Sequence, residues 1–192
     1  MGIRCFIAIE IPEALRLAIG QAIWKLRSSG ADVKWVDPGL IHITLKFLGD
    51  TEESRIGEAQ RVLSQKVSHY APFYIKIAGL DSFPSGRHPR VVWAGIAEST
   101  VLTALQKEIE LGLADSGFPA EDRPFRPHLT IGRVKTGRRI ADLVNSVRES
   151  GNIMFGDFEV RGVRLMKSEL RPAGPVYTCL ADIPLMGGND VD

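Results

Sequence analysis

Residues 42–49 read HITLKFLG, and their alternation of polar and apolar residues is typical of a half-buried strand. Residues i and i+2 of a strand project from one face, so one face is expected to carry His42, Thr44 and Lys46. The opposite face is left for the apolar residues Ile41, Ile43, Leu45 and Phe47. This stretch therefore predicts a strand with a buried face and a polar face that opens with a histidine.

A second copy of the pattern follows 86 positions later (128 minus 42), where residues 128–133 read HLTIGR. His128 and Thr130 are again expected on one face, with Leu129 and Ile131 opposite. Outside the two motifs the halves share little sequence, so the repeat is one of organisation.

The elements around each motif repeat the order strand, helix, strand, helix, strand, with one strand added in the second half. Strands are expected at 3–11, 33–36, 41–48, 73–80, 91–96, 128–134, 158–170 and 175–183. Helices are expected after Pro12, after an Asp50–Glu53 capping box, after a Ser99 or Thr100 cap, and over 138–150. This order predicts an α+β protein with two lobes in one catalytic unit, residues 1–192, ending in a frayed tail at 186–192.

The composition is that of a soluble globular protein, with 44% hydrophobic and 24% charged residues and a net charge of +1. Nucleic-acid binding would therefore need a local basic patch. No apolar run reaches the roughly 18 residues that span a bilayer, and we expect no export signal and no membrane contact. Cys5 and Cys179 do not have the C-x-x-C spacing that is typical of metal or redox sites. They are expected to be buried thiols, which fits a cytoplasmic protein.

Paired histidines suit acid–base chemistry on one reacting centre, because imidazole titrates near neutrality, with an unperturbed pKa of about 6.5. A threonine hydroxyl beside each ring can bind an anionic oxygen. A phosphodiester fits this arrangement, and a strained 2′,3′-cyclic phosphate fits it best. A metal site would need further ligands at suitable spacing, which neither motif carries, so we expect neither metal nor cofactor. The other two histidines, His69 and His88, are expected in a polar helix end and a basic loop.

Several cations near the motifs are candidates for binding phosphate or RNA. Strict alternation would turn Arg133 away from the His128 face, but a bulge at Gly132 would bring it back as a phosphate ligand. Possible RNA contacts are Lys46, Arg87, Arg90 and Arg126. Core packing is the expected role of Trp35, Trp93 and Phe125.

At these residues the chain resembles the two-histidine phosphoesterase superfamily, and within it the RNA 2′,3′-cyclic phosphodiesterases, also called 2′-5′ RNA ligases. The resemblance is carried in order by RCFIAIEIP, HITLKFLGD, FPSGRHPRVVWAGI and FRPHLTIGRV, and it covers nearly the whole chain. It implies a bilobal, pseudo-twofold fold in which each lobe is a mostly antiparallel sheet with outer helices around a central cleft.

The resemblance also implies an activity, the metal-independent hydrolysis of RNA 2′,3′-cyclic phosphate ends to 2′-phosphates. His42 matches the proton donor, His128 the proton acceptor, and Thr44 and Thr130 the phosphate-binding threonines. The opposite assignment of the two histidines stays open, as does the reverse 2′-5′ ligation. The alternative from another class is an RNA-end-binding protein without turnover. The expected partner is an RNA with a cyclic phosphate end, tRNA fragments included, bound by a monomer.

Overall fold

The computed structural model describes residues 2–172 and 174–187, and both sheets that it contains are antiparallel. The strands are β1 (Gly2–Glu10), β2 (Val33–Trp35), β3 (His42–Glu52), β4 (Phe73–Phe83), β5 (Val91–Ile96), β6 (His128–Val134), β7 (Met154–Val160), β8 (Gly162–Arg171) and β9 (Gly174–Pro184). The helices are α1 (Glu13–Arg27), α2 (Ile56–Val67), α3 (Thr100–Asp115) and α4 (Ile140–Glu149), with short 3-10 turns at Pro38–Leu40 and Glu53–Arg55. The α+β class expected from the sequence is confirmed.

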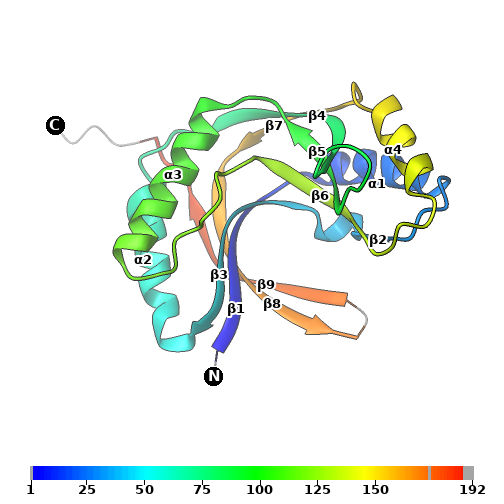
Figure 1. Ribbon diagram of the computed structural model, residues 1–192. Coiled ribbons are helices and arrows are strands. Elements are labelled where there is room, and N and C mark those ends of the chain that lie inside the picture. Colours follow the sequence, from blue (N-terminus) through cyan, green and yellow to red (C-terminus); the bar gives the residue numbers. More distant parts are fainter. Residues whose placement is uncertain (1, 173, 188–192) are drawn as a thin grey trace.

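Two sheets form the two lobes, and Figure 1 shows them on either side of the molecule's centre. Sheet A has the strand order β3-β1-β8-β9, and sheet B has the order β2-β6-β5-β4-β7. Helices α2 and α3 pack together, and they contact strands of sheet A. Helices α1 and α4 contact sheet B at β7 and β4. Each sheet therefore has an outer face covered by helices and an inner face, and we call the two units lobe A and lobe B.

The lobes do not coincide with the two halves of the chain. Sheet A joins β1 and β3 from the start of the chain to β8 and β9 from its end, and sheet B is built mainly from the middle. Helix α1 follows a strand of sheet A but covers sheet B, so the chain crosses between the lobes at once. The repeat in element order is real, but the halves are interleaved.

Two local predictions were wrong. The expected strand at 158–170 is two strands in different sheets, because β7 ends at Val160 and β8 begins at Gly162. A side chain at Gly162 would place its Cβ 2.9 Å from the Ile183 carbonyl oxygen, which explains the glycine at this crossing. The expected Asp50 cap is also wrong: β3 runs on to Glu52, where Asp50 pairs with Arg4, and α2 starts only at Ile56.

Other predicted helix signals are confirmed by the described contacts. Pro12 is the N-cap residue of α1, whose buried stripe is Leu15, Ile19, Ala22, Ile23 and Leu26. The Ser99 hydroxyl accepts a hydrogen bond from the Leu102 amide and caps α3. A cap of this kind stabilises a helix by about 1 kcal/mol.

A single cluster of buried apolar side chains runs through both lobes, and it includes the apolar faces of the two motif strands. Ile43 and Leu129, which follow the two histidines, are both fully buried. Burying one such side chain stabilises the fold by about 1.5–3 kcal/mol. The motif histidines thus lie on strands whose opposite faces are anchored in the core.

The remaining structural expectations concern the cysteines, the tail and the membrane. Cys5 and Cys179 are free thiols, but only Cys5 is buried, so the prediction for Cys179 was wrong. Most of the tail expected at 186–192 lies outside the described residues, although the amides of Met186 and Gly187 donate to carbonyls of Ser68 and Tyr70. Among residues 2–172 and 174–187, no helix is long and apolar enough to cross a membrane.

Candidate active site

A β-bulge in β6 turns Arg133 onto the same face as the second motif. Thr130 lies opposite Trp93 and Gly132 lies opposite Val92, so Ile131 is the extra residue of the bulge. A Cβ at Gly132 would lie 2.8 Å from a methyl carbon of Val33 and 2.9 Å from the Trp35 ring, which explains why a glycine is needed there. The bulge predicted from the sequence is confirmed, and Arg133 extends from the inner face of sheet B as an exposed cation.

The same bulge occurs in β3, where the sequence did not predict it. Thr44 lies opposite Ala8 and Lys46 lies opposite Ile7, so Leu45 is the extra residue. Beyond the bulge the faces exchange: Lys46 turns into the core and Phe47 becomes exposed. The predictions for these two side chains were therefore wrong. Phe47 now occupies the position in lobe A that Arg133 occupies in lobe B.

Lys46 is a buried structural cation. Its ammonium group lies 2.7 and 2.8 Å from the two carboxylate oxygens of Glu110 in α3, and it also donates to the carbonyl oxygen of Pro119 at 2.7 Å. The lysine side chain is 0% exposed. Because all three ammonium protons have acceptors inside the protein, Lys46 does not fit the RNA contact expected from the sequence.

The two histidine rings are held in matching ways. The Nδ1 atom of His42 lies 2.8 Å from the carbonyl oxygen of Leu40, and Nδ1 of His128 lies 2.7 Å from the carbonyl oxygen of Arg126. A carbonyl oxygen can only accept, so both Nδ1 atoms carry a proton. Each ring is thus held through Nδ1, and its Nε2 atom is left to take or give a proton.

His42 lies among aromatic rings of lobe A. Phe6 stacks on it with a centroid separation of 4.8 Å, and Tyr177 meets it edge-on at 5.4 Å. Burial lowers the pKa of His42 below its ordinary value, and the hydrogen bond to Leu40 opposes this. Arg16 adds to the decrease, whereas Glu10 raises the pKa. The apolar rings fix the imidazole and favour its neutral form.

His128 lies against two rings of lobe B that also stack on each other. Phe83 meets it edge-on at 5.3 Å, Trp93 lies 6.3 Å away, and Phe83 and Trp93 are 4.9 Å apart. Trp93 is therefore part of the candidate site, and its expected role in the core was wrong; Trp35 and Phe125 do pack against the core. The buried indole nitrogen of Trp93 has no hydrogen-bond partner among the described residues.

The two motif strands approach each other where the lobes meet, since β3 and β6 contact one another. Tyr177 connects the two sides: its ring packs on His42, and the charge of Arg133 acts on its phenol. Burial raises the pKa of Tyr177, and Arg133 and Arg4 oppose this only in part, so the phenol is neutral near pH 7. Two histidines, two threonines and Arg133 thus project from the inner faces of two adjoining strands.

The other candidate RNA contacts lie around lobe B. The Arg126 guanidinium carbon is 6.0 Å from the centre of the Phe83 ring, which brings it close to His128. The backbone of Arg90 bridges the strand ends, because its amide donates to Phe83 and its carbonyl accepts from Val134. Arg87 and His88 lie in the exposed loop before it. Lys34, opposite Arg133 in β2, is an exposed cation of the same face that the sequence did not indicate.

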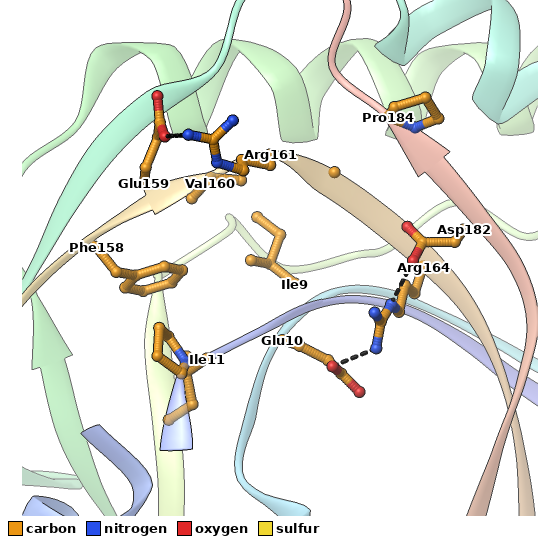
Figure 2. A pocket seen from close by; sticks show the side chains of 12 residues that line it. Ile9, Glu10, Ile11, Phe158, Glu159, Val160, Arg161, Arg164, Asp182 and Pro184 are labelled. Atoms are coloured by element: carbon orange, nitrogen blue, oxygen red, sulfur yellow. Dashed lines mark hydrogen bonds and ion pairs between the residues drawn. The ribbon is translucent and has the colours of Figure 1, made fainter. Parts of the chain in front are cut away.

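A hollow of about 610 Å³ opens where the chain crosses between the lobes, and Figure 2 shows the side chains that line it. Its charged residues are already paired within the protein. Arg164 contacts Glu10 and lies 2.9 Å from Asp182, and Arg161 contacts Glu159. The hollow therefore offers no free charge to a ligand. One of its lining residues, Glu10, lies directly opposite His42 in sheet A.

The family model of the 2′-5′ RNA ligase superfamily matches residues 18–171, a range that contains both motifs. The chain belongs to the 2′-5′ RNA ligase superfamily. This confirms the family expected from the paired His-x-Thr motif.

Relatives and solved structures agree with this membership. The RNA 2′,3′-cyclic phosphodiesterase of Methanothermobacter thermautotrophicus is 38% identical over 178 residues, 93% of this chain and 96% of its own. That of Archaeoglobus fulgidus is 37% identical over 174 residues, 91% of this chain and 96% of its own. A crystal structure from Thermus thermophilus matches 97% of this chain and 100% of its own, with a TM-score of 0.82 and 30% identity. Escherichia coli LigT, complexed with 3′-AMP, has a TM-score of 0.75 over 96% of this chain and 99% of its own, and its 21% identity shows the shared fold alone.

Proposed function

We propose that this superfamily member is an RNA 2′,3′-cyclic phosphodiesterase that opens the cyclic phosphate to a 2′-phosphate by paired histidine catalysis. The observation that carries the proposal is the matched pair of imidazoles, each held by its Nδ1 proton on a backbone carbonyl with Nε2 left for proton transfer. Relatives that carry this name share 37–38% identity over nine-tenths of the chain.

In the proposed reaction, Nε2 of His128 takes a proton from water as the water oxygen attacks phosphorus. The bond from phosphorus to O3′ breaks in line, and Nε2 of His42 gives its proton to the departing O3′. The 2′-phosphate product therefore contains the oxygen of the water, and the two histidines end with their protonation states exchanged. Acid–base catalysis by a positioned pair contributes about 10²–10⁴-fold for each group.

Thr44 and Thr130 are proposed to donate hydrogen bonds to the non-bridging phosphate oxygens, and Arg133 to supply a charged fork beside them. Arg126, Arg90 and Arg87 are proposed to contact the RNA strand from lobe B, which fits their exposure and their place around Phe83. These groups would hold the phosphate without a metal. No group of three or more His, Cys, Asp or Glu side chains suited to a metal occurs in residues 2–172 and 174–187.

The test is ring opening of a short RNA that ends in a 2′,3′-cyclic phosphate, incubated with the protein in excess chelator. We expect a 2′-phosphate product, and we expect His42→Ala and His128→Ala each to lower turnover by at least about 10²-fold while the far-UV spectrum is unchanged. His69→Ala is the matched control, because His69 is exposed and belongs to neither motif.

Three outcomes would count against the proposal. Tight binding of the RNA end without turnover would favour the binding-protein alternative, and turnover only with added metal would remove the metal-free mechanism. A 3′-phosphate product would mean that O2′, and not O3′, is the leaving group. Ligation can be assayed in the same mixture with an RNA that bears a 5′-hydroxyl, and water at roughly 55 M favours hydrolysis unless that end is held in place.

A further inference from the structure

The inner faces of the two lobes offer equivalent positions around their histidines, and one of these positions differs in charge. On β1, Glu10 lies directly opposite His42, as Ala8 lies opposite Thr44. On β5, Gly95 lies directly opposite His128, as Trp93 lies opposite Thr130. Residues directly opposite in an antiparallel pair share a face with Cβ atoms about 4.5–5.5 Å apart. His42 therefore has a carboxylate neighbour at the position where His128 has a glycine.

The packing of lobe B excludes a carboxylate beside His128 at this position. A Cβ placed on Gly95 would overlap the carbonyl oxygen of Ala78 in the neighbouring strand and would lie 3.3 Å from the Trp93 ring. The charges that lobe B places on the His128 face are the cations Arg133 and Lys34 and, opposite Trp93 on β4, the carboxylate of Asp81. An anion stabilises imidazolium, so the Glu10 carboxylate acts on His42 in the direction opposite to burial and to Arg16.

We propose that Glu10 is a positioning residue that favours the proton on His42 and thereby makes His42 the acid of the pair. The proposal rests on the function proposed above. The two histidines have matching hydrogen bonds at Nδ1, and Glu10 would explain why one of them acts as the acid and the other as the base.

Glu10 is held in place by arginines of lobe A, as Figure 2 shows for Arg164. Arg164 contacts Glu10 and is shared with Asp182, to which its Nε atom donates at 2.9 Å. Arg16 of α1 lies 3.8 Å from the Glu10 carboxylate. The two carboxylates Glu10 and Asp182 therefore face two arginines, Arg16 and Arg164. The pair also orients the carboxylate, which is 42% exposed and would otherwise be free to turn away.

The remaining groups that face His42 give a mixed field. The neutral phenol of Tyr177 comes from β9, and Arg16 of α1 is the cation that acts on the ring. Burial and Arg16 lower the pKa of His42, whereas Glu10 raises it. The hydrogen bond to Leu40 is the main effect that opposes burial, and Glu10 acts in the same direction with the smallest effect of the four.

The first experiment is an NMR titration of the two histidine rings in the free protein, which needs no substrate. In Glu10→Gln we expect the pKa of His42 to fall, by less than the roughly one unit at the low end for a nearby charge, because Glu10 is exposed and paired with two arginines. The titration of His128 is expected to stay in place.

Glu159→Gln is the matched control, since Glu159 lines the same hollow and is paired with Arg161 but is not opposite His42. This variant should leave both titrations unchanged. An unchanged His42 titration in Glu10→Gln, or an equal shift in Glu159→Gln, would overturn the proposal.

The second experiment is the pH profile of kcat/KM on the cyclic phosphate substrate. If His42 is the acid, Glu10→Gln should move the alkaline limb of the bell to lower pH and leave the acidic limb in place. A shift of the acidic limb instead would mean that His42 is the base, and it would overturn the assignment. If the wild type shows no turnover, the proposed function fails, while the NMR titration still decides whether Glu10 acts on His42.

Discussion

The buried ion pair of Lys46 allows a quantitative test of the β3 bulge. Replacing Lys46 with Met leaves the Glu110 carboxylate without its cation and removes the donor to Pro119. Loss of one partner from a buried pair typically costs about 3–5 kcal/mol. We expect the low end, about 3 kcal/mol, because Glu110 is 18% exposed and still accepts from the Glu121 amide.

For a chain of 192 residues, an unfolding entropy of about 2.1 cal/mol/K per residue converts this loss into a decrease in Tm of about 7 °C. Urea unfolding at constant pH measures the same loss as a lower midpoint. Lys34→Met is the matched control, because Lys34 is an exposed strand lysine, and the expected change is within about 0.5 kcal/mol. The double variant Lys46→Met with Glu110→Met should be more stable than Lys46→Met alone, since it removes the unpaired carboxylate.

The reasoning would be refuted if Lys46→Met were as stable as the wild type and instead bound RNA more weakly, with a smaller dependence on salt. That result would mean that Lys46 points to the inner face, as strict alternation of the strand predicts. It would also remove the bulge that gives Phe47 its exposed position.

Two further predictions concern the inner faces. Arg133→Met should lower kcat/KM on the cyclic phosphate by about 10- to 100-fold, because it removes a charged hydrogen bond worth about 1.5–3 kcal/mol. Lys135→Met is the control, since Lys135 lies just beyond the end of β6, and it should change kcat/KM little. Equal effects of the two variants would mean that the positive charge acts at long range and that Arg133 does not contact the phosphate directly. The lowered pKa of His42 predicts that the unfolded state binds its proton more readily, so this ring's contribution to stability is present above pH 6.5 and is lost as the pH falls below it. Urea unfolding from pH 8 to pH 5 should therefore show a shallower loss of stability in His42→Gln than in the wild type, and parallel curves would contradict the assignment.

The local elements were largely accessible from the sequence. Periodicity and caps act over a few residues, which is why the stripe of α1, the Ser99 cap and the two motif strands could be placed by reading along the chain. The two His-x-Thr motifs also led to the family, because each pairs a titratable ring with a hydroxyl at a spacing of two. The bulge at Gly132 was accessible for the same reason, since a glycine in a strand marks such a position.

The errors share one physical cause, which is that contacts between distant segments decide them. Nothing near Lys46 in the sequence indicates that Glu110 and Pro119 will surround its ammonium group. The chain is interrupted at Arg161 because β7 pairs in sheet B and β8 pairs in sheet A. Trp93 lies at the candidate site because it packs against Phe83 and His128, which come from two other strands.

The sequence by itself determined the α+β class, the paired motifs and the chemistry that two imidazoles permit. Only the tertiary structure decided which segments share a sheet, how the bulge in β3 turns Lys46 inward, and what surrounds each histidine. The pairing of Glu10 with His42, and of Gly95 with His128, follows from strand register. Register is set by packing across the whole sheet, so the difference between the two otherwise matched rings appears only once the chain is folded.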